Sequence, residues 1–126
     1  MPMIFLLAAA AAGQAFTCTP TGVAASDGPI LCAEGPQIAL AGIAPRSGTA
    51  ARDRLVQALG GPKGTREGYV LVKAEPMRCT WAESGEIGTL AACSVGRSDL
   101  GCMMVYEGYA LPAADRGGAR RCSAVG

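Results

Sequence analysis

The stretch Gln37-Ile38-Ala39-Leu40-Ala41-Gly42-Ile43 is an apolar segment that ends at Ala44-Pro45 and decides how the rest of the chain is arranged. Two shorter apolar segments precede it, and the turn signals Asp27-Gly28-Pro29 and Glu34-Gly35-Pro36 separate the three. We therefore predict three consecutive strands in a meander. The two earlier strands are expected at 16–25 and 30–32.

A helical pattern follows this meander directly. Ala50, Ala51, Leu55, Ala58 and Leu59 fall at helical spacing, with polar residues on the other face. The pattern predicts a helix capped by Thr49 and ended by Gly60-Gly61-Pro62.

The second half of the chain predicts two strands and a shorter helix. β-formers at Tyr69–Lys73 lead into Met77–Trp81, and another apolar segment runs from Gly88 to Val95. Ser98 is the expected N-cap of the last helix, which Gly108 ends. The order βββ-α-ββ-α is typical of a β-barrel with helices, the five-stranded Greek-key OB-fold. An unspecific small α+β roll is the alternative that this order leaves open.

Length and charge exclude several classes of protein. The 126 residues hold one small domain, and eleven Lys and Arg against ten Asp and Glu leave a net charge of +1. Capture of nucleic acid by an overall positive field is excluded, so a local basic patch would have to bind it. The chain has no His, which excludes Ser-His-Asp and Cys-His catalysis and zinc sites that contain His.

Residues 1–15 carry no charged side chain and are predicted to be a signal peptide. The apolar run is too short for a membrane span, and small residues at Gly13 and Ala15 suit cleavage before Phe16. A buried N-terminal helix or a lipid-facing anchor is the alternative. We expect an exported protein, periplasmic or extracellular, with no membrane span in its mature part.

All six cysteines follow the expected leader, and an even count in a small exported chain predicts disulfides. Zinc is the competing interpretation, but no Cys-x-x-Cys pair occurs in the sequence. Six cysteines allow 15 pairings, and the sequence does not choose among them. The six are Cys18, Cys32, Cys79, Cys93, Cys102 and Cys122.

Two stretches carry a resemblance to a known family. The third apolar segment, Ile38–Pro45, and the stretch from Gly96–Leu100 through Glu107–Ala110 resemble staphylococcal-nuclease-like (thermonuclease-like) domains. Phe16–Cys18 and Asp27–Pro36 look like the cysteine-containing exported branch of that family. The resemblance implies an SNase-like OB-fold domain. We place this domain at 16–115, followed by a basic, partly mobile C-terminal tail at 116–126.

That family hydrolyses phosphodiesters of DNA and RNA with a bound Ca²⁺. Asp27 matches the metal-binding second Asp of the family's D-G-D turn, whose first Asp is replaced by Ala25, and the family's second metal-binding Asp falls on Ala44. One Asp cannot supply the six to eight oxygens that Ca²⁺ prefers. Asp27 is therefore expected to be a vestigial metal ligand, and no cofactor is expected unless a nuclease site that binds Ca²⁺ survives.

The resemblance also implies catalytic residues that this chain lacks. The family's phosphate-binding Arg falls on Ala39, and its Glu falls on Arg46 or Ser47. Its second catalytic Arg meets Ile87-Gly88-Thr89. Losing several such groups together abolishes most of the rate enhancement, so no catalytic residue is predicted and the domain is interpreted as a pseudoenzyme.

Three functions remain open. The first is a binding or structural module, for example for a cell-envelope protein. The second is a nuclease with a rewired site. The third is binding of single-stranded nucleic acid, for which the aromatic residues are few. The candidate acids are Asp27, Glu34, Glu83 and Glu86; the candidate phosphate-binding residues are Arg46, Arg52 and Arg54; the aromatic residues weighed are Tyr69, Trp81, Tyr106 and Tyr109.

Overall fold

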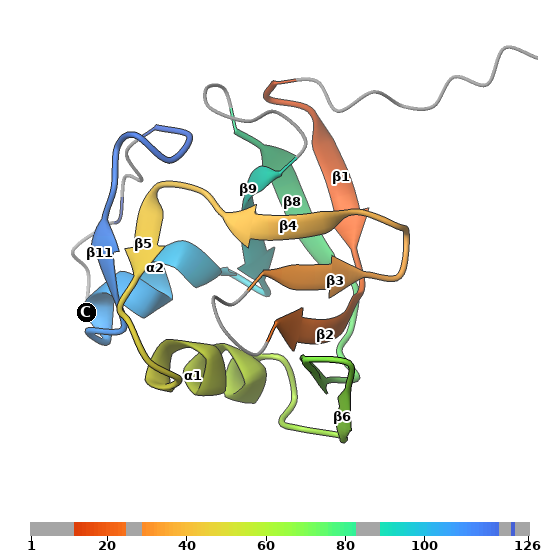
Figure 1. Cartoon of the computed structure of the whole chain (residues 1–126). Coiled ribbons are helices and arrows are strands. Elements are labelled where there is room, and N and C mark those ends of the chain that lie inside the picture. The colour runs from red at the N-terminus through yellow and green to blue at the C-terminus, as the bar shows by residue number, and fades with distance from the viewer. Residues whose placement is uncertain (1–11, 25–28, 83–88, 119–121, 123–126) are drawn as a thin grey trace, which may run out of the picture.

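Residues 12–24, 29–82, 89–118 and 122 are described by a computed structural model, a mostly β protein with two helices (Figure 1). The helices are α1 (Ala50–Ala58) and α2 (Leu100–Tyr106). The strands are β1 (Ala15–Cys18), β2 (Pro20–Ala24), β3 (Ile30–Cys32), β4 (Gln37–Leu40), β5 (Ile43–Pro45), β6 (Thr65–Arg66), β7 (Tyr69–Leu71), β8 (Met77–Trp81), β9 (Leu90–Val95), β10 (Ser98–Asp99) and β11 (Ala110–Pro112).

The main sheet has the hydrogen-bonded order β1-β8-β9-β4-β3-β2-β7-β6, with β10 also on β9. Only Thr19 separates β1 from β2, yet β1 pairs with β8 while β2 pairs with β3 and β7. The Thr19 backbone N–H donates to Glu34 Oε1 at 2.7 Å, so it is bonded outside the strand ladder. The first predicted strand is thus two strands, and across the described ranges the sheet is open: the predicted closed barrel is not formed.

The third predicted strand is also divided. β4 pairs with β3 and, in parallel, with β9, whereas β5 leaves this sheet and pairs with β11. Between them Gly42 has φ 77°, a conformation that glycine adopts without steric cost. The apolar pattern of 37–43 indicated a single strand, and Gly42, which can mark a bend inside a strand, was its one sign of the reversal.

Both predicted helices are present. α1 follows Thr49, whose side chain makes no capping hydrogen bond, and its apolar side is buried in the core. The N-cap of α2 is Asp99 rather than the predicted Ser98, because the Asp99 carboxylate accepts a hydrogen bond from the Cys102 backbone N–H at 2.9 Å. Gly108, with φ 81°, follows the end of α2 as predicted.

Three disulfides confirm the predicted role of the cysteines and exclude zinc binding by them. Cys18–Cys32 joins the ends of β1 and β3, Cys79–Cys93 joins the paired strands β8 and β9, and Cys102–Cys122 ties the C-terminal segment to α2. Such bridges persist in an oxidising, extracytoplasmic environment. Four of the six half-cystines, those at positions 18, 32, 79 and 93, belong to the hydrophobic core.

Residues 13–15 pair with β8 next to the expected cleavage site. The Gly13 backbone N–H donates to the Trp81 carbonyl and the Trp81 N–H donates to the Gln14 carbonyl, both at 3.0 Å. The Phe16 ring stacks on Trp81 with 4.0 Å between ring centroids. Residues 1–11 of the predicted signal peptide lie outside the described part. In the described part of the chain, neither helix has the length and apolarity needed to cross a membrane.

A chain that begins at Phe16 is predicted to be less stable than one that begins at Gly13. It loses both backbone hydrogen bonds to Trp81, each of which contributes about 0.5–1.5 kcal/mol, so the free energy of unfolding should fall by about 1–3 kcal/mol. Urea titration followed by Trp81 fluorescence measures the difference, with a chain that begins at Ala12 as the control of unchanged stability. Equal stability of all three chains would show that these bonds contribute nothing.

Candidate anion-binding site

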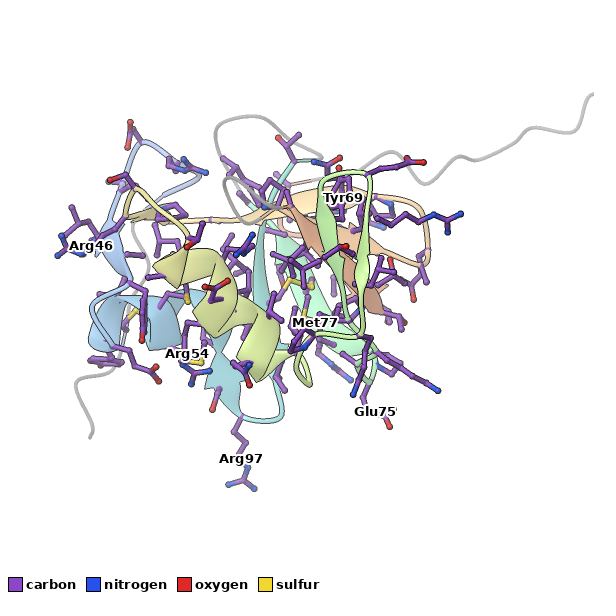
Figure 2. All side chains as sticks on the ribbon, turned by 60° about the horizontal axis from the view of Figure 1, so that its bottom comes forward. Arg46, Arg54, Tyr69, Glu75, Met77 and Arg97 are labelled. Carbon is purple, nitrogen blue, oxygen red and sulfur yellow. A yellow bond between two sulfur atoms is a disulfide. The ribbon has the colours of Figure 1, made fainter. Side chains whose placement is uncertain are left out.

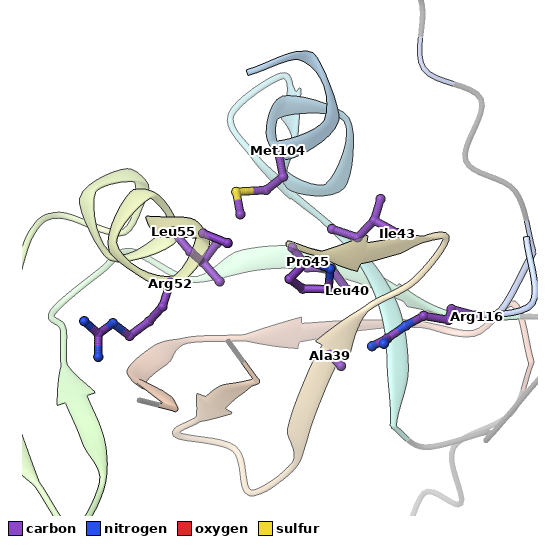
Figure 3. Close-up of a pocket in the computed structure, with 9 residues that line it drawn as sticks. Ala39, Leu40, Ile43, Pro45, Arg52, Leu55, Met104 and Arg116 are labelled. Atoms are coloured by element: carbon purple, nitrogen blue, oxygen red, sulfur yellow. The ribbon is translucent and has the colours of Figure 1, made fainter. Parts of the chain in front are cut away.

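An open cleft of about 520 Å³ lies where β4, β5, the start of α1 and the C-terminal segment meet. Its floor and walls come from small or apolar residues and from three arginines. A smaller apolar pocket of about 20 Å³ shares five of these residues and extends toward Leu55 and Met104 (Figure 3). The cleft is lined by Pro29, Ala39, Pro45, Arg46, Ser47, Gly48, Ala51, Arg52 and Arg116.

All charged residues in the described cleft lining are positive. Arg46, Arg52 and Arg116 are lining residues, with the Arg52 side chain extending away from Arg116 (Figure 3), and no Asp or Glu is among the lining residues that the structure describes. Positive groups around a concave surface raise the local concentration of anions. A chain with a net charge of only +1 therefore carries a local basic cleft.

The β5–β11 pair positions Arg46. Its backbone N–H donates to the Tyr109 carbonyl at 2.9 Å, which extends the ladder beyond Pro45. The Arg46 side chain then donates from Nε to the Gly108 carbonyl at 2.8 Å. These two bonds hold an exposed guanidinium at the rim of the cleft.

The first turn of α1 supplies Arg52. Its Nε and Nη2 both donate to Asp53 Oδ1, at 2.9 and 2.6 Å. The Arg52 side chain is 18% exposed and that of Asp53 is 59% exposed, so the carboxylate lies on the solvent side of the pair. Arg52 thus enters the cleft lining with part of its charge already balanced.

Arg116 reaches the cleft from the opposite side. Figure 3 shows its side chain extending to a place beside Ala39 on β4. The residue is half-buried, and its Nε atom is buried with no hydrogen-bond partner in the described structure. Buried polar groups in folded proteins are nearly always paired, so an unpaired donor needs an explanation.

Arg54 is not part of the cleft lining. It points from α1 to α2, where Nε donates to Glu107 Oε1 at 2.5 Å and Nη2 donates to Oε2 at 3.1 Å. Hydrogen bonding to Glu107 raises the pKa of the Arg54 guanidinium, and the same bonds lower the pKa of the Glu107 carboxyl. The structure gives Arg54 a structural partner between the helices.

Of the candidate acids, only Glu34 lies in the described part of the chain, and it is not among the cleft-lining residues. Pro29 precedes β3 at the cleft, whereas Glu34 follows β3 at the other end of that strand. Asp27, Glu83 and Glu86 lie outside the described residues. Within 12–24, 29–82, 89–118 and 122, no group of three or more His, Cys, Asp or Glu residues is placed to hold a metal ion.

The aromatic side chains lie away from the cleft. Trp81 is 7% exposed and stacks on Phe16, and the Tyr69 hydroxyl donates to Gln37 Oε1 at 3.4 Å. Tyr106 is exposed on α2, and Tyr109 packs against the core. None of the described cleft-lining residues is aromatic, so bases have no stacking platform there.

Of the three arginines predicted to bind phosphate, Arg46 and Arg52 line the cleft and Arg54 does not. Arg116, which also lines it, was assigned to the basic, partly mobile tail. The signals that could have indicated Arg116 are the glycine pair that follows it and the tether at Cys122.

No protein-family model, curated protein or solved structure matches this chain. The resemblance to SNase-like domains therefore rests on the sequence motifs alone. The properties of the cleft are taken from the structure alone: three arginines line it, and a small apolar pocket adjoins it.

Replacing Glu34 by Gln is predicted to change how stability depends on pH. The Thr19 backbone N–H and then its hydroxyl, which donates to Oε2 at 2.7 Å, lower the pKa of the Glu34 carboxyl in the folded state. A lowered folded-state pKa stabilises the fold above the unfolded pKa, near 4.5, and this contribution is lost as pH falls through the folded-state value. Tm of Glu34→Gln should be below wild type at pH 6 and should approach it at pH 3.

The exposed Glu75 provides the matched control, because no hydrogen bond or ion pair of its side chain is found within the described ranges. Glu75→Gln should follow the wild-type Tm at both pH values. A constant difference between Glu34→Gln and wild type from pH 6 to pH 3 would contradict the assigned carboxylate–Thr19 interaction.

Proposed function

We propose that this chain is an exported SNase-like OB-fold domain that does not hydrolyse phosphodiesters and instead binds an anionic ligand in its cleft. The observation that carries the proposal is the cleft lining: Arg46, Arg52 and Arg116 contribute positive charge, and the lining residues described include no carboxylate. Guanidinium groups bind phosphate and carboxylate oxygens through paired hydrogen bonds.

The order of elements supports the fold proposed. The first strand segment is shared between two parts of the sheet, since β1 pairs with β8 and β2 with β3. An OB-fold is a five-stranded, partly open Greek-key barrel, which a sheet with such long-range pairings suits. α1 follows the third strand segment and α2 follows the last long strand, as the resemblance implies.

The absence of hydrolysis follows from the chemistry of the lining. Ca²⁺ needs six to eight oxygen ligands, and among the described lining residues only Ser47 carries a side-chain oxygen. Ala39 in the cleft wall and Ala44 on β5 carry no group that ionises. Water at the cleft therefore meets no described general base, while the arginines still attract an anion.

Binding of single-stranded nucleic acid is the second candidate function, because its phosphates are anions that three arginines suit. The cleft supplies no aromatic side chain for base stacking, which contributes about 1–3 kcal/mol per base in such proteins. Binding through phosphates alone would be weak and strongly dependent on salt. The proposal therefore favours a small phosphate-bearing ligand.

The oxidised protein is predicted to leave single-stranded DNA uncut in the presence of Ca²⁺. The expected rate equals that of buffer alone, measured by gel electrophoresis of an end-labelled oligonucleotide. Cleavage that requires Ca²⁺ and is lost in Asp27→Ala would establish the rewired nuclease and refute the proposal. Ca²⁺-dependent cleavage that persists in repurified Asp27→Ala would place the site on the other candidate acids, Glu34, Glu83 or Glu86, and would also refute the proposal.

Oligonucleotide binding separates the two candidate functions. Fluorescence anisotropy of a labelled dT oligomer is predicted to show weak binding at low salt that disappears at physiological ionic strength, since only phosphate contacts are available. A labelled oligomer is used because Trp81 is buried against Phe16 and would not report on the cleft. Tight binding that survives physiological salt would favour the nucleic-acid function.

A further inference from the structure

We propose that Arg116, delivered by the C-terminal segment, is the principal ligand-binding residue of the cleft and that the group it binds is a phosphate on a small molecule. This inference rests on the proposed function and deepens it by naming the residue and the ligand class. The predicted boundary at 115 would have left Arg116 outside the domain, whereas the structure makes it part of the cleft wall.

The backbone around Arg116 is bonded to the bend between β4 and β5. The Gly42 N–H donates to the Arg116 carbonyl at 2.6 Å, and the Gly42 carbonyl accepts from the Ala113 N–H at 2.8 Å. The Arg116 N–H in turn donates to the Ala113 carbonyl at 3.1 Å. These three bonds fix the Arg116 backbone relative to β4, where Ala39 lies.

The residue after Arg116 anchors the segment sterically. Gly117 has φ 88°, and a Cβ atom built there would lie 2.7 Å from Ala82 Cβ and 3.3 Å from Ala41 Cβ. Real Cβ atoms do not approach so closely, so only glycine allows the segment to lie this close to the sheet. Farther along, Cys122 is bonded to Cys102 on α2. The C-terminal segment is thus close-packed on the sheet at Gly117 and bonded to α2 at Cys122.

The Arg116 side chain has a hydrogen-bond donor, Nε, that is unpaired in the described structure and could bind an anion. No ion pair of Arg116 is found among the described residues, and its buried Nε lacks a hydrogen-bond partner. The small side chain of Ala39 leaves the space beside β4 in which Arg116 extends (Figure 3). A half-buried guanidinium that has no countercharge among the described residues favours the entry of an anion into the cleft.

A phosphate group suits this arrangement better than a carboxylate or a base-containing strand. The three arginines line different parts of the cleft: Arg116 on the C-terminal segment, Arg46 at the rim, and Arg52 on α1 with a side chain that extends away from Arg116 (Figure 3). A tetrahedral dianion can present a pair of oxygens to Arg116 and still direct others toward a second arginine, whereas a carboxylate presents only two oxygens in one plane. The adjoining apolar pocket offers room only for a small substituent on that phosphate.

Isothermal titration of the full oxidised chain with inorganic phosphate tests the inference. At fixed ionic strength we expect saturable binding, weakened about tenfold or more in Arg116→Gln, because a charged hydrogen-bond partner is lost. The control is Arg97→Gln, which removes the same charge from an exposed turn between β9 and β10, far from Arg46 and the cleft (Figure 2). Its affinity should equal that of wild type.

A second pair of variants tests whether the segment positions Arg116. Gly117→Ala should weaken phosphate binding about as much as Arg116→Gln, because the added methyl group collides with Ala82 and displaces the segment. Gly118 also has a positive φ, of 97°, but a Cβ built there meets nothing within 4 Å. Gly118→Ala carries comparable backbone strain without the collision, and should bind phosphate more tightly than Gly117→Ala. Thermal unfolding of each variant confirms that it folds.

The inference is overturned if wild type binds no phosphate, if Arg116→Gln binds as wild type does, or if Arg97→Gln is weakened equally. The last two results would still leave an anion-binding, non-hydrolytic domain. Failure of the proposed function has a separate signature, Ca²⁺-dependent cleavage of DNA that Asp27→Ala abolishes.

Discussion

The backbone reversal at Gly42 is the constraint on which the cleft depends. Its positive φ directs β4 into the main sheet and β5 toward β11, so that one continuous apolar stretch contributes to two sheets. The N–H and carbonyl groups freed at this bend are bonded to Arg116 and Ala113. The bend therefore opens the space between β4 and β5 and also docks the segment that lines it.

Charge is distributed so that a nearly neutral chain has a basic cavity in its described part. Several acids are engaged by partners elsewhere: Glu34 by Thr19 and Glu107 by Arg54, while Asp53 faces solvent beside Arg52. The described core contains no buried polar or charged residue.

Three disulfides add stability, typically about 2–4 kcal/mol each, to a domain of this size. Ala39 on β4 and Ala44 on β5 add no charged group that would need solvation.

The sequence predicted elements whose signals are local. The apolar face of α1, the glycine after α2 and the even cysteine count each depend on neighbouring residues, and each prediction is confirmed. The divided first and third strands escaped prediction because Thr19 and Gly42 act through partners distant in sequence, Glu34 and the 113–116 segment. Arg116 was missed for the same reason, since only the folded chain brings it to Ala39. Arg54 is the opposite case: it was a candidate for phosphate binding, but in the folded chain it is paired with Glu107 at the C-terminal end of α2.

The central claim is that the cleft takes an anion where a nuclease would hold a cation. Crystals of the oxidised protein soaked separately in phosphate and in calcium chloride would test it by difference density. We expect phosphate within hydrogen-bond distance of Arg116 and at least one other cleft arginine, and no ion on Asp27 in the calcium soak. Calcium held by Asp27 with further carboxylates, and no phosphate beside Arg116, would contradict the account.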